Sequence, residues 1–359
     1  KQKTAYEIGV RLVGSEMCIR DRYLGPAITP LQSYTKDMSI INGVFLSETD
    51  SGHDAAEKYM LTGSTGLQSS MVLNFAGASE QKAGLGVITN KALVRGKSRA
   101  SSSAIEGLKQ AYQTKFTGSN LDYFSSAHTH NSPLVSALKK IVTNSPNMYQ
   151  YFEYLKAENY SQDYTLESDA VLVANAFRSN SSHFAQLEVE IQGEGLDTHS
   201  NHEGVHLASQ KEAFESIKKL MDVFKKTPFE DTGESIYDRT TFMITSEFSR
   251  TSALNNAKGK DHNPLTNSIM FIGNGIQGNQ VIGKSRLVDR KHSRMGASYQ
   301  IALPYDYQAG RVIEQRTQSP DFIRPENILR TLSDILRVDP EKLTNIDPQT
   351  PVLKKLIKS

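Results

Sequence analysis

The sequence predicts an α/β fold in which a mainly parallel central sheet is covered by helices on both faces. Short apolar runs of strand length alternate along the chain with longer segments whose apolar residues recur at helical spacing. This alternation favours crossover connections and hence parallel strands. Carboxylates and histidines cluster in loops beside the predicted strands, where ligands bind in open α/β sheets. The sequence therefore predicts both a fold class and the place of a site.

The predicted elements follow from apolar runs and helical periodicity. The run MSIINGVFL, after a proline-bounded loop, has the composition of a buried strand, and the helix formers that follow end at a stop signal, Thr62-Gly63. The segment LEVEI alternates apolar and acidic residues as a half-buried strand does, and residues 171–174 are compatible with a strand or a helix. We expect strands at 38–46, 187–191, 240–245 and 268–272, and helices at 54–61, 101–115, 134–142, 205–224 and 325–336.

Composition and net charge limit the classes of binding partner that the sequence predicts. Lys and Arg total 41 against 39 Asp and Glu, and the net charge of +2 gives no electrostatic reason to expect nucleic acid or a membrane surface. The apolar runs are far shorter than the roughly 20 residues that span a bilayer, so no membrane span is predicted. Small anions remain possible partners, and the sequence leaves the oligomeric state open.

The single cysteine, Cys18, lies in a segment that resembles a translated sequencing adapter. The string LVGSEMCIRDR at 12–22 carries this resemblance. We therefore expect residues 1–22 to be non-native, residues 23–359 to form a single domain, and the native N-terminus, with any export signal, to be missing. The alternative interpretation of 12–22 is a genuine amphipathic helix. Without Cys18, disulfides and thiolate ligands are excluded.

Three clusters of carboxylates and histidines predict a metal site. They are a D-T-H triplet at 197–199, followed by His202 and His206, an E-F-S-R segment at 247–250 and a K-D-H triplet at 260–262. Carboxylate oxygens and imidazole nitrogens suit a divalent metal; Zn²⁺ is the expected ion, and Mn²⁺, Mg²⁺ and Ca²⁺ are alternatives. The predicted ligands are Asp197, His199, Glu247, Asp261 and His262.

Each cluster also has a simpler interpretation. The D-T-H triplet fits a capped loop, and Glu247 with Arg250 fits a surface salt bridge. The placement of all three clusters at strand ends favours a shared site. Two other motifs are decoys: the glycines of 273–278 match a dinucleotide fingerprint but no helical period follows, and His128 and His130 have metal-like spacing without a nearby carboxylate.

The segments GLDTHSNHE, TTFMITSEFSRT, GKDHNP and MFIGNGIQGNQVIG resemble, in the same order, the sulfatase-like family called domain of unknown function 1501. The resemblance covers most of the chain from about residue 24, including GPAITPL and RPENILRTLSDILRVDP. This family is similar to alkaline phosphatases and sulfatases. The resemblance therefore implies an alkaline-phosphatase-like fold lacking its N-terminal part, a periplasmic or extracellular bacterial protein, and metal-dependent hydrolysis of a phosphate or sulfate ester.

The chain departs from the alkaline phosphatase pattern at two places. The Ser-Asp-His motif of those enzymes falls on 246–248, where Phe248 cannot replace a histidine of a second metal site. By spacing from 61–63, the nucleophile position falls on His53. His53 and Ser51 are thus the candidates for nucleophile or phosphate contact, and the alternative is an ordinary capped helix start.

The remaining roles follow from the resemblance. Arg250 and Lys260 are candidates for stabilising the anion, because a guanidinium matches the geometry of an oxyanion. His53 or His202 is the candidate general acid or base. The alternative function is a non-catalytic, exported, metal-stabilised binding protein on the same scaffold. A phosphomutase-like isomerase would need a cap domain, and no break in composition marks one.

Overall fold

The computed structural model describes residues 18–19, 22–48, 52–64, 165–189, 195–288, 299–314 and 321–358, with residue 191 and short pieces between 75 and 158. Ser51, His128, His130 and the helices expected at 101–115 and 134–142 lie outside the described residues. Two compact units make up the chain. The first contains residues 1–74, 191–218 and 239–359, and the second contains residues 75–190 and 219–238. The single domain expected from the sequence stays a prediction.

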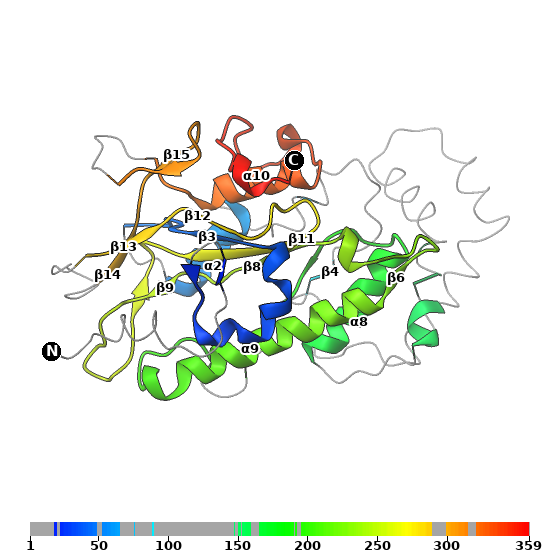
Figure 1. The fold of residues 1–359 in the computed structure, drawn as a ribbon, viewed down its shortest axis with the longest axis horizontal. Helices are drawn as coiled ribbons and strands as arrows, with labels where there is room; N and C mark the ends of the chain where they lie inside the picture. The colour runs from blue at the N-terminus through cyan, green and yellow to red at the C-terminus, as the bar shows by residue number, and fades with distance from the viewer. Residues whose placement is uncertain are drawn as a thin grey trace, which may run out of the picture. The chain divides into compact units, whose positions relative to one another are not determined.

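The first unit contains a four-stranded mixed sheet with the order β12-β3-β11-β8, drawn as arrows in Figure 1. The inner strand β11 runs antiparallel to β3 and β8, with Ile269 opposite Ile41 and Phe271 opposite Met243, whereas β12 is parallel to the other inner strand, β3. The strands are β3 (Met38–Asn42), β8 (Thr241–Ile244), β11 (Ser268–Gly273) and β12 (Gln280–Ile282). Strands were predicted at the positions of β3, β8 and β11.

The α/β class is confirmed, but the described sheet is not mainly parallel. The segment 245–267, which joins β8 to β11 and is described throughout, contains the short strands β9 (Ser249–Arg250) and β10 (His262–Asn263) and no helix. Parallel neighbours need a long crossover, whereas strands joined without one pair antiparallel. The alternation of element types did not reveal which connections cross over.

Helix α2 (Gly52–Thr62) is fixed by helix α10 (Pro325–Ile335) within the first unit. The hydroxyl of Tyr59 donates to Oε2 of Glu326 at 2.8 Å. Gly63 ends α2 with a φ of +69°, a conformation that glycine adopts without strain. Both helices were predicted. The α2–α10 contact fixes the end of α2 remote from His53, and the helix in turn positions that histidine.

The described residues of the second unit include helix α8 (Leu166–Arg178), and the long helix α9 (His202–Lys226) contributes to both units. Thr165 caps α8, because its hydroxyl accepts a hydrogen bond from the backbone N of Ser168 at 3.2 Å. The segment 171–174 is therefore helical. The prediction of a strand at 187–191 is wrong. The strand found is β5 (Ala185–Gln186), and residues 187–189 have no strand partner among the described residues. An alternation of apolar and acidic residues indicates a half-buried segment, but it does not show whether a neighbouring strand pairs with it.

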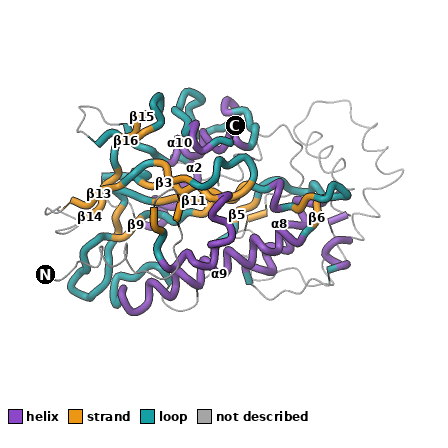
Figure 2. The backbone as a smooth tube through the Cα atoms, viewed as in Figure 1, coloured by secondary structure: helices purple, strands orange, loops and turns teal. Residues whose placement is uncertain are grey.

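Figure 2 shows the backbone coloured by helix, strand and loop, including the shorter elements. A 3₁₀ helix, η1 (Pro26–Asp37), occupies the predicted proline-bounded loop and contacts β3 and β11. No described helix combines the length and apolarity that crossing a membrane requires. The other strands are β1 (Cys18–Ile19), β2 (Arg22–Tyr23), β4 (Ile88–Thr89), β6 (Pro228–Phe229), β7 (Glu234–Ser235), β13 (Ser285–Val288), β14 (Tyr299–Ala302), β15 (Tyr305–Asp306) and β16 (Arg311–Val312), and the short 3₁₀ helices are η2 (Tyr237–Arg239), η3 (Pro340–Lys342) and η4 (Lys354–Leu356).

Candidate metal centre

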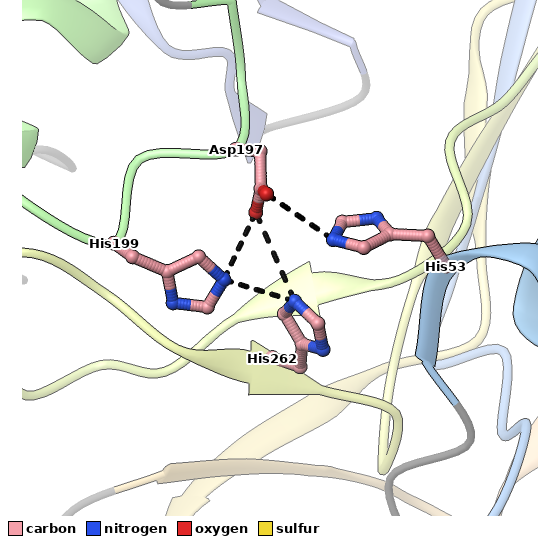
Figure 3. A group of neighbouring side chains, drawn as sticks. All are labelled: His53, Asp197, His199 and His262. Atoms are coloured by element: carbon pink, nitrogen blue, oxygen red, sulfur yellow. Dashed lines mark hydrogen bonds and ion pairs between the residues drawn. The ribbon is translucent and has the colours of Figure 1, made fainter.

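Three imidazoles and one carboxylate converge in the first unit, as Figure 3 shows. One ligand atom from each of His53, Asp197, His199 and His262 lies within 4.8 Å of the other three. Nε2 of His199 is 3.1 Å from Oδ1 of Asp197 and 3.0 Å from Nε2 of His262. Nε2 of His53 is 3.2 Å from Oδ2 of Asp197. We call these four residues the metal group, because their donor atoms lie close enough together to bind one cation.

Three separate chain segments supply the metal group. His53 lies in the first turn of α2, and His262 lies in β10 directly opposite Arg250 of β9. Asp197 and His199 lie in the loop before α9, where the backbone N of Lys260 donates to the oxygen of Thr198 at 2.9 Å. The site therefore depends on a helix, a short hairpin ladder and a loop held by backbone hydrogen bonds.

Two further carboxylates contact the histidines of the metal group. Oε1 of Glu247 is 3.2 Å from Nδ1 of His53, and Oδ1 of Asp261 is 3.0 Å from Nδ1 of His199. In both rings Nε2 is the nitrogen that faces Asp197 (Figure 3). A carboxylate on the outer nitrogen is the usual means of orienting a metal-binding histidine. Of the five ligands predicted from the sequence, three belong to the metal group, and Glu247 and Asp261 adjoin it.

The charges around Asp197 favour its ionised form. Nη2 of Arg250 donates to Oδ1 of Asp197, and Nη1 lies 3.3 Å from Nε2 of His199. Partial burial by itself raises the pKa of Asp197, but the hydrogen bond and charge of Arg250, with the charges of His53 and His199, hold this pKa below its ordinary value. An ionised carboxylate is the form that a metal requires.

An apolar side chain lies beside the metal group. Phe248 is only 5% exposed, and its ring centroid is 4.3 Å from that of His262 and 5.2 Å from that of His53. Among the described residues, the metal group is the one set of histidines and carboxylates whose donor atoms lie close enough together to hold a metal ion.

Four other residues were predicted to act in catalysis, namely Ser51, His202, Arg250 and Lys260. Arg250 contacts Asp197 of the metal group directly. His202 and His206 stack at 4.2 Å between ring centroids, and their Nδ1 atoms lie 2.6 Å and 3.2 Å from the hydroxyl of Thr198. The side chain of Lys260 is partly buried; burial lowers the pKa of its ammonium group, and the charge of Glu203 opposes that shift. Ser51 lies outside the described residues.

Sequence reasoning missed two features of the site. His53 was predicted as a nucleophile or phosphate contact, whereas its ring nitrogens face Asp197 and Glu247. Asn255 was not singled out, although its Nδ2 donates to the backbone oxygen of His199 at 3.0 Å and to Oδ1 of Asp261 at 2.9 Å. A single asparagine in a polar loop carries no motif that could have indicated this role.

A family model described as "Protein of unknown function (DUF1501)" matches residues 75–300, more than half of the chain. No curated protein and no solved structure matches the sequence. The matched segment includes Asp197, His199 and His262 of the metal group, and His53 precedes it. The chain therefore belongs to the DUF1501 family of proteins of unknown function.

Proposed function

We propose that the protein is a metal-dependent hydrolase of a phosphate or sulfate ester, with the cation bound by the metal group. The observation that supports this proposal is the convergence of three imidazoles and one carboxylate from three chain segments within 4.8 Å. The order of the sulfatase-like motifs supports the reaction class. On the basis of the same motifs we also propose that the fold is alkaline-phosphatase-like.

The donor set fits a borderline transition-metal ion. Imidazole nitrogens suit Zn²⁺ and Mn²⁺, whereas Mg²⁺ and Ca²⁺ prefer all-oxygen ligands. Four protein ligands complete a tetrahedral shell, and a catalytic ion needs at least one further position for water or substrate. An ion held by all four residues would therefore need a coordination number above four to leave a position for water or substrate.

The residues around the metal group can bind and orient an anion. A divalent cation bound there supplies Lewis-acid polarisation of an ester oxygen. Arg250 lies beside the same point, and its side chain is only 12% exposed, so its donors are held in place. A guanidinium can offer two parallel donors to the oxygens of a phosphate or sulfate group. Phe248 is buried and packs against the ring of His262, so one side of this point is lined by an apolar side chain.

One observation favours the second function, a metal-stabilised binding protein without catalysis. His53 occupies the position expected for the nucleophile, yet Nε2 lies 3.2 Å from Asp197 and Nδ1 lies 3.2 Å from Glu247. Both nitrogens are thereby engaged with carboxylates, which suits a ligand better than a nucleophile.

Metal analysis followed by assays on aryl phosphate and aryl sulfate distinguishes the two functions. We expect the wild-type protein to bind one Zn²⁺ or Mn²⁺ per chain and to hydrolyse one of the two substrate classes. His199→Ala should lose more than about 100-fold in metal affinity, because removal of an outer-shell partner alone costs about 10–100-fold. His183→Ala is the matched control, since His183 contacts Asn180 and belongs to the second unit.

Each result assigns a function. Metal binding without turnover of either ester establishes the binding protein and rejects the hydrolase. A protein that binds no divalent metal, or whose metal affinity is the same after His199→Ala, rejects both proposals.

A further inference from the structure

Asn255 lies outside the metal group and bonds to both loops that build it. Its Nδ2 donates to the backbone oxygen of His199 at 3.0 Å and to Oδ1 of Asp261 at 2.9 Å. Its Oδ1 accepts hydrogen bonds from the backbone N of Ala257 and Gly259, each at 2.9 Å. All four hydrogen-bonding positions of a carboxamide are thus used. One side chain joins the loop 251–261 to the loop that carries His199.

Asp261 connects Asn255 to the ring of His199. Oδ1 of Asp261 is 2.9 Å from Nδ2 of Asn255 and 3.0 Å from Nδ1 of His199. A carboxylate oxygen accepts hydrogen bonds, so His199 donates from Nδ1 to Oδ1 of Asp261. The lone pair of Nε2 then faces the metal group.

We propose that Asn255 is a positioning residue of the metal centre, which holds Asp261 so that His199 presents Nε2 to the cation. This inference rests on the metal binding proposed above and extends it to a residue that touches neither the cation nor its ligands' side chains. Outer-shell partners of this kind fix the tautomer and the orientation of a ligating histidine.

The backbone around Asn255 supports the same role. The loop closes on itself through hydrogen bonds from the N of Asn255 to the oxygen of Gly259 at 2.8 Å and from the N of Lys258 to the oxygen of Asn255 at 3.0 Å. Gly259 then approaches His199 so closely that an added Cβ would lie 1.8 Å from the His199 backbone oxygen. The closed turn brings the amide of Asn255 to the backbone of a ligand.

Zinc titration of Asn255→Ala against a competing chelator tests the inference. We expect the zinc affinity to fall about 10–100-fold. The visible absorption of the cobalt-loaded protein should also change, because the ring of His199 loses its fixed orientation. Asn327→Ala is the matched control: Asn327 is 5% exposed, donates to the oxygen of Pro351 and accepts from the N of Arg324, both at 3.0 Å, and lies in α10. This control should lower the unfolding temperature without changing the zinc affinity or the cobalt spectrum.

A second measurement on the wild-type protein does not depend on whether a variant folds. Long-range proton–nitrogen NMR of the zinc-loaded protein should find the His199 ring proton on Nδ1. A proton on Nε2 overturns the inference, as does Asn255→Ala with wild-type zinc affinity and an unchanged cobalt spectrum. These results leave zinc binding intact and so differ from failure of the proposed function, in which the wild-type protein binds no zinc and both ideas are rejected.

Discussion

Asp197 is the residue on which the charges of the metal centre converge. Its carboxylate lies 3.2 Å from Nε2 of His53, 3.1 Å from Nε2 of His199 and 3.8 Å from Nε2 of His262. Oδ1 also accepts a hydrogen bond from Arg250. A cation bound to the metal group therefore competes with a guanidinium for one oxygen. Metal affinity and anion affinity should respond in opposite directions to a change at Arg250.

The substitution Arg250→Gln tests this opposition. Two like charges about 5 Å apart repel by about 3 kcal/mol at an effective dielectric constant of about 20. Removing the guanidinium should therefore raise the zinc affinity by about tenfold or more, and it should weaken the binding of inorganic phosphate to the zinc-loaded protein. Isothermal titration with zinc and then with phosphate measures both. Arg330→Gln, which breaks the contact of Arg330 with Asp334 in α10, is the control. A lower zinc affinity after Arg250→Gln would show instead that Arg250 organises Asp197 for the metal.

His202 and His206 should make the metal-free protein sensitive to acid. Burial lowers the pKa of His202 to about 4, with contributions from the charges of His206, Lys260 and Arg250. Burial, with the charges of Arg250 and Lys260, also lowers the pKa of His206. Histidines of an unfolded chain titrate near about pH 6.5, so between about pH 6.5 and 4 the unfolded state binds more protons than the folded state. The stabilisation is therefore complete above about pH 6.5 and is lost as the pH falls towards 4.

Urea unfolding at a series of pH values, with a chelator present, measures this dependence. The slope of the unfolding free energy against pH should become smaller in this window after His202→Asn. An unchanged slope would show that other groups account for the acid sensitivity.

Two loops, 197–202 and 251–261, meet backbone to backbone at the metal centre. The N of Lys260 donates to the oxygen of Thr198, and the N of His202 donates to the oxygen of Lys258, both at 2.9 Å. Gly259 lies at this contact, where a Cβ would meet the backbone oxygen of His199. The spacing of the two loops leaves no room for a side chain.

The substitution Gly259→Ala should therefore push the loops apart. We expect it to lower the free energy of unfolding by about 1–3 kcal/mol, the usual range for overpacking, and to weaken zinc binding in the folded protein. Gly25→Ala is the control, because nothing lies within 4 Å of an added Cβ there and the φ of −63° suits any residue. Chemical denaturation and zinc titration of both variants compare the effects. Equal stability and zinc affinity in the two variants would contradict a tight loop contact.

The sequence predicted elements well where one local property decides the outcome. The apolar runs of β8 and β11 and the helical periodicity of α9 mark these elements without reference to the rest of the chain. Strand direction was not predictable, because it depends on the pairing of segments far apart in the sequence. The D-T-H and K-D-H triplets indicated a metal site because each is a local motif. The contribution of His53 was not predictable, because it depends on how α2 packs against distant segments.

At the scale of the whole molecule, the metal group links segments that are distant in the sequence. His199 and His262 are 63 residues apart, and His53 is 194 residues from its partner Glu247. An unfolded chain does not hold such residues together, so a cation binds the folded state far more tightly. All four residues belong to the first compact unit. Metal binding should therefore stabilise that unit selectively.

Scanning calorimetry with and without zinc measures this coupling. At a free zinc concentration 100 times the dissociation constant, binding adds about 2.7 kcal/mol to the free energy of unfolding. For a unit of this size each kcal/mol raises the unfolding temperature by about 2–4 °C, so we expect a rise of about 5–11 °C, and the chelator should reverse the shift. His53→Ala should abolish the shift and His183→Ala should retain it, because only His53 belongs to the metal group. If the two units unfold in separate transitions, zinc should move the transition of the first unit alone. A shift that survives His53→Ala would mean that zinc stabilises the protein through other residues, and the coupling through the metal group would then be wrong.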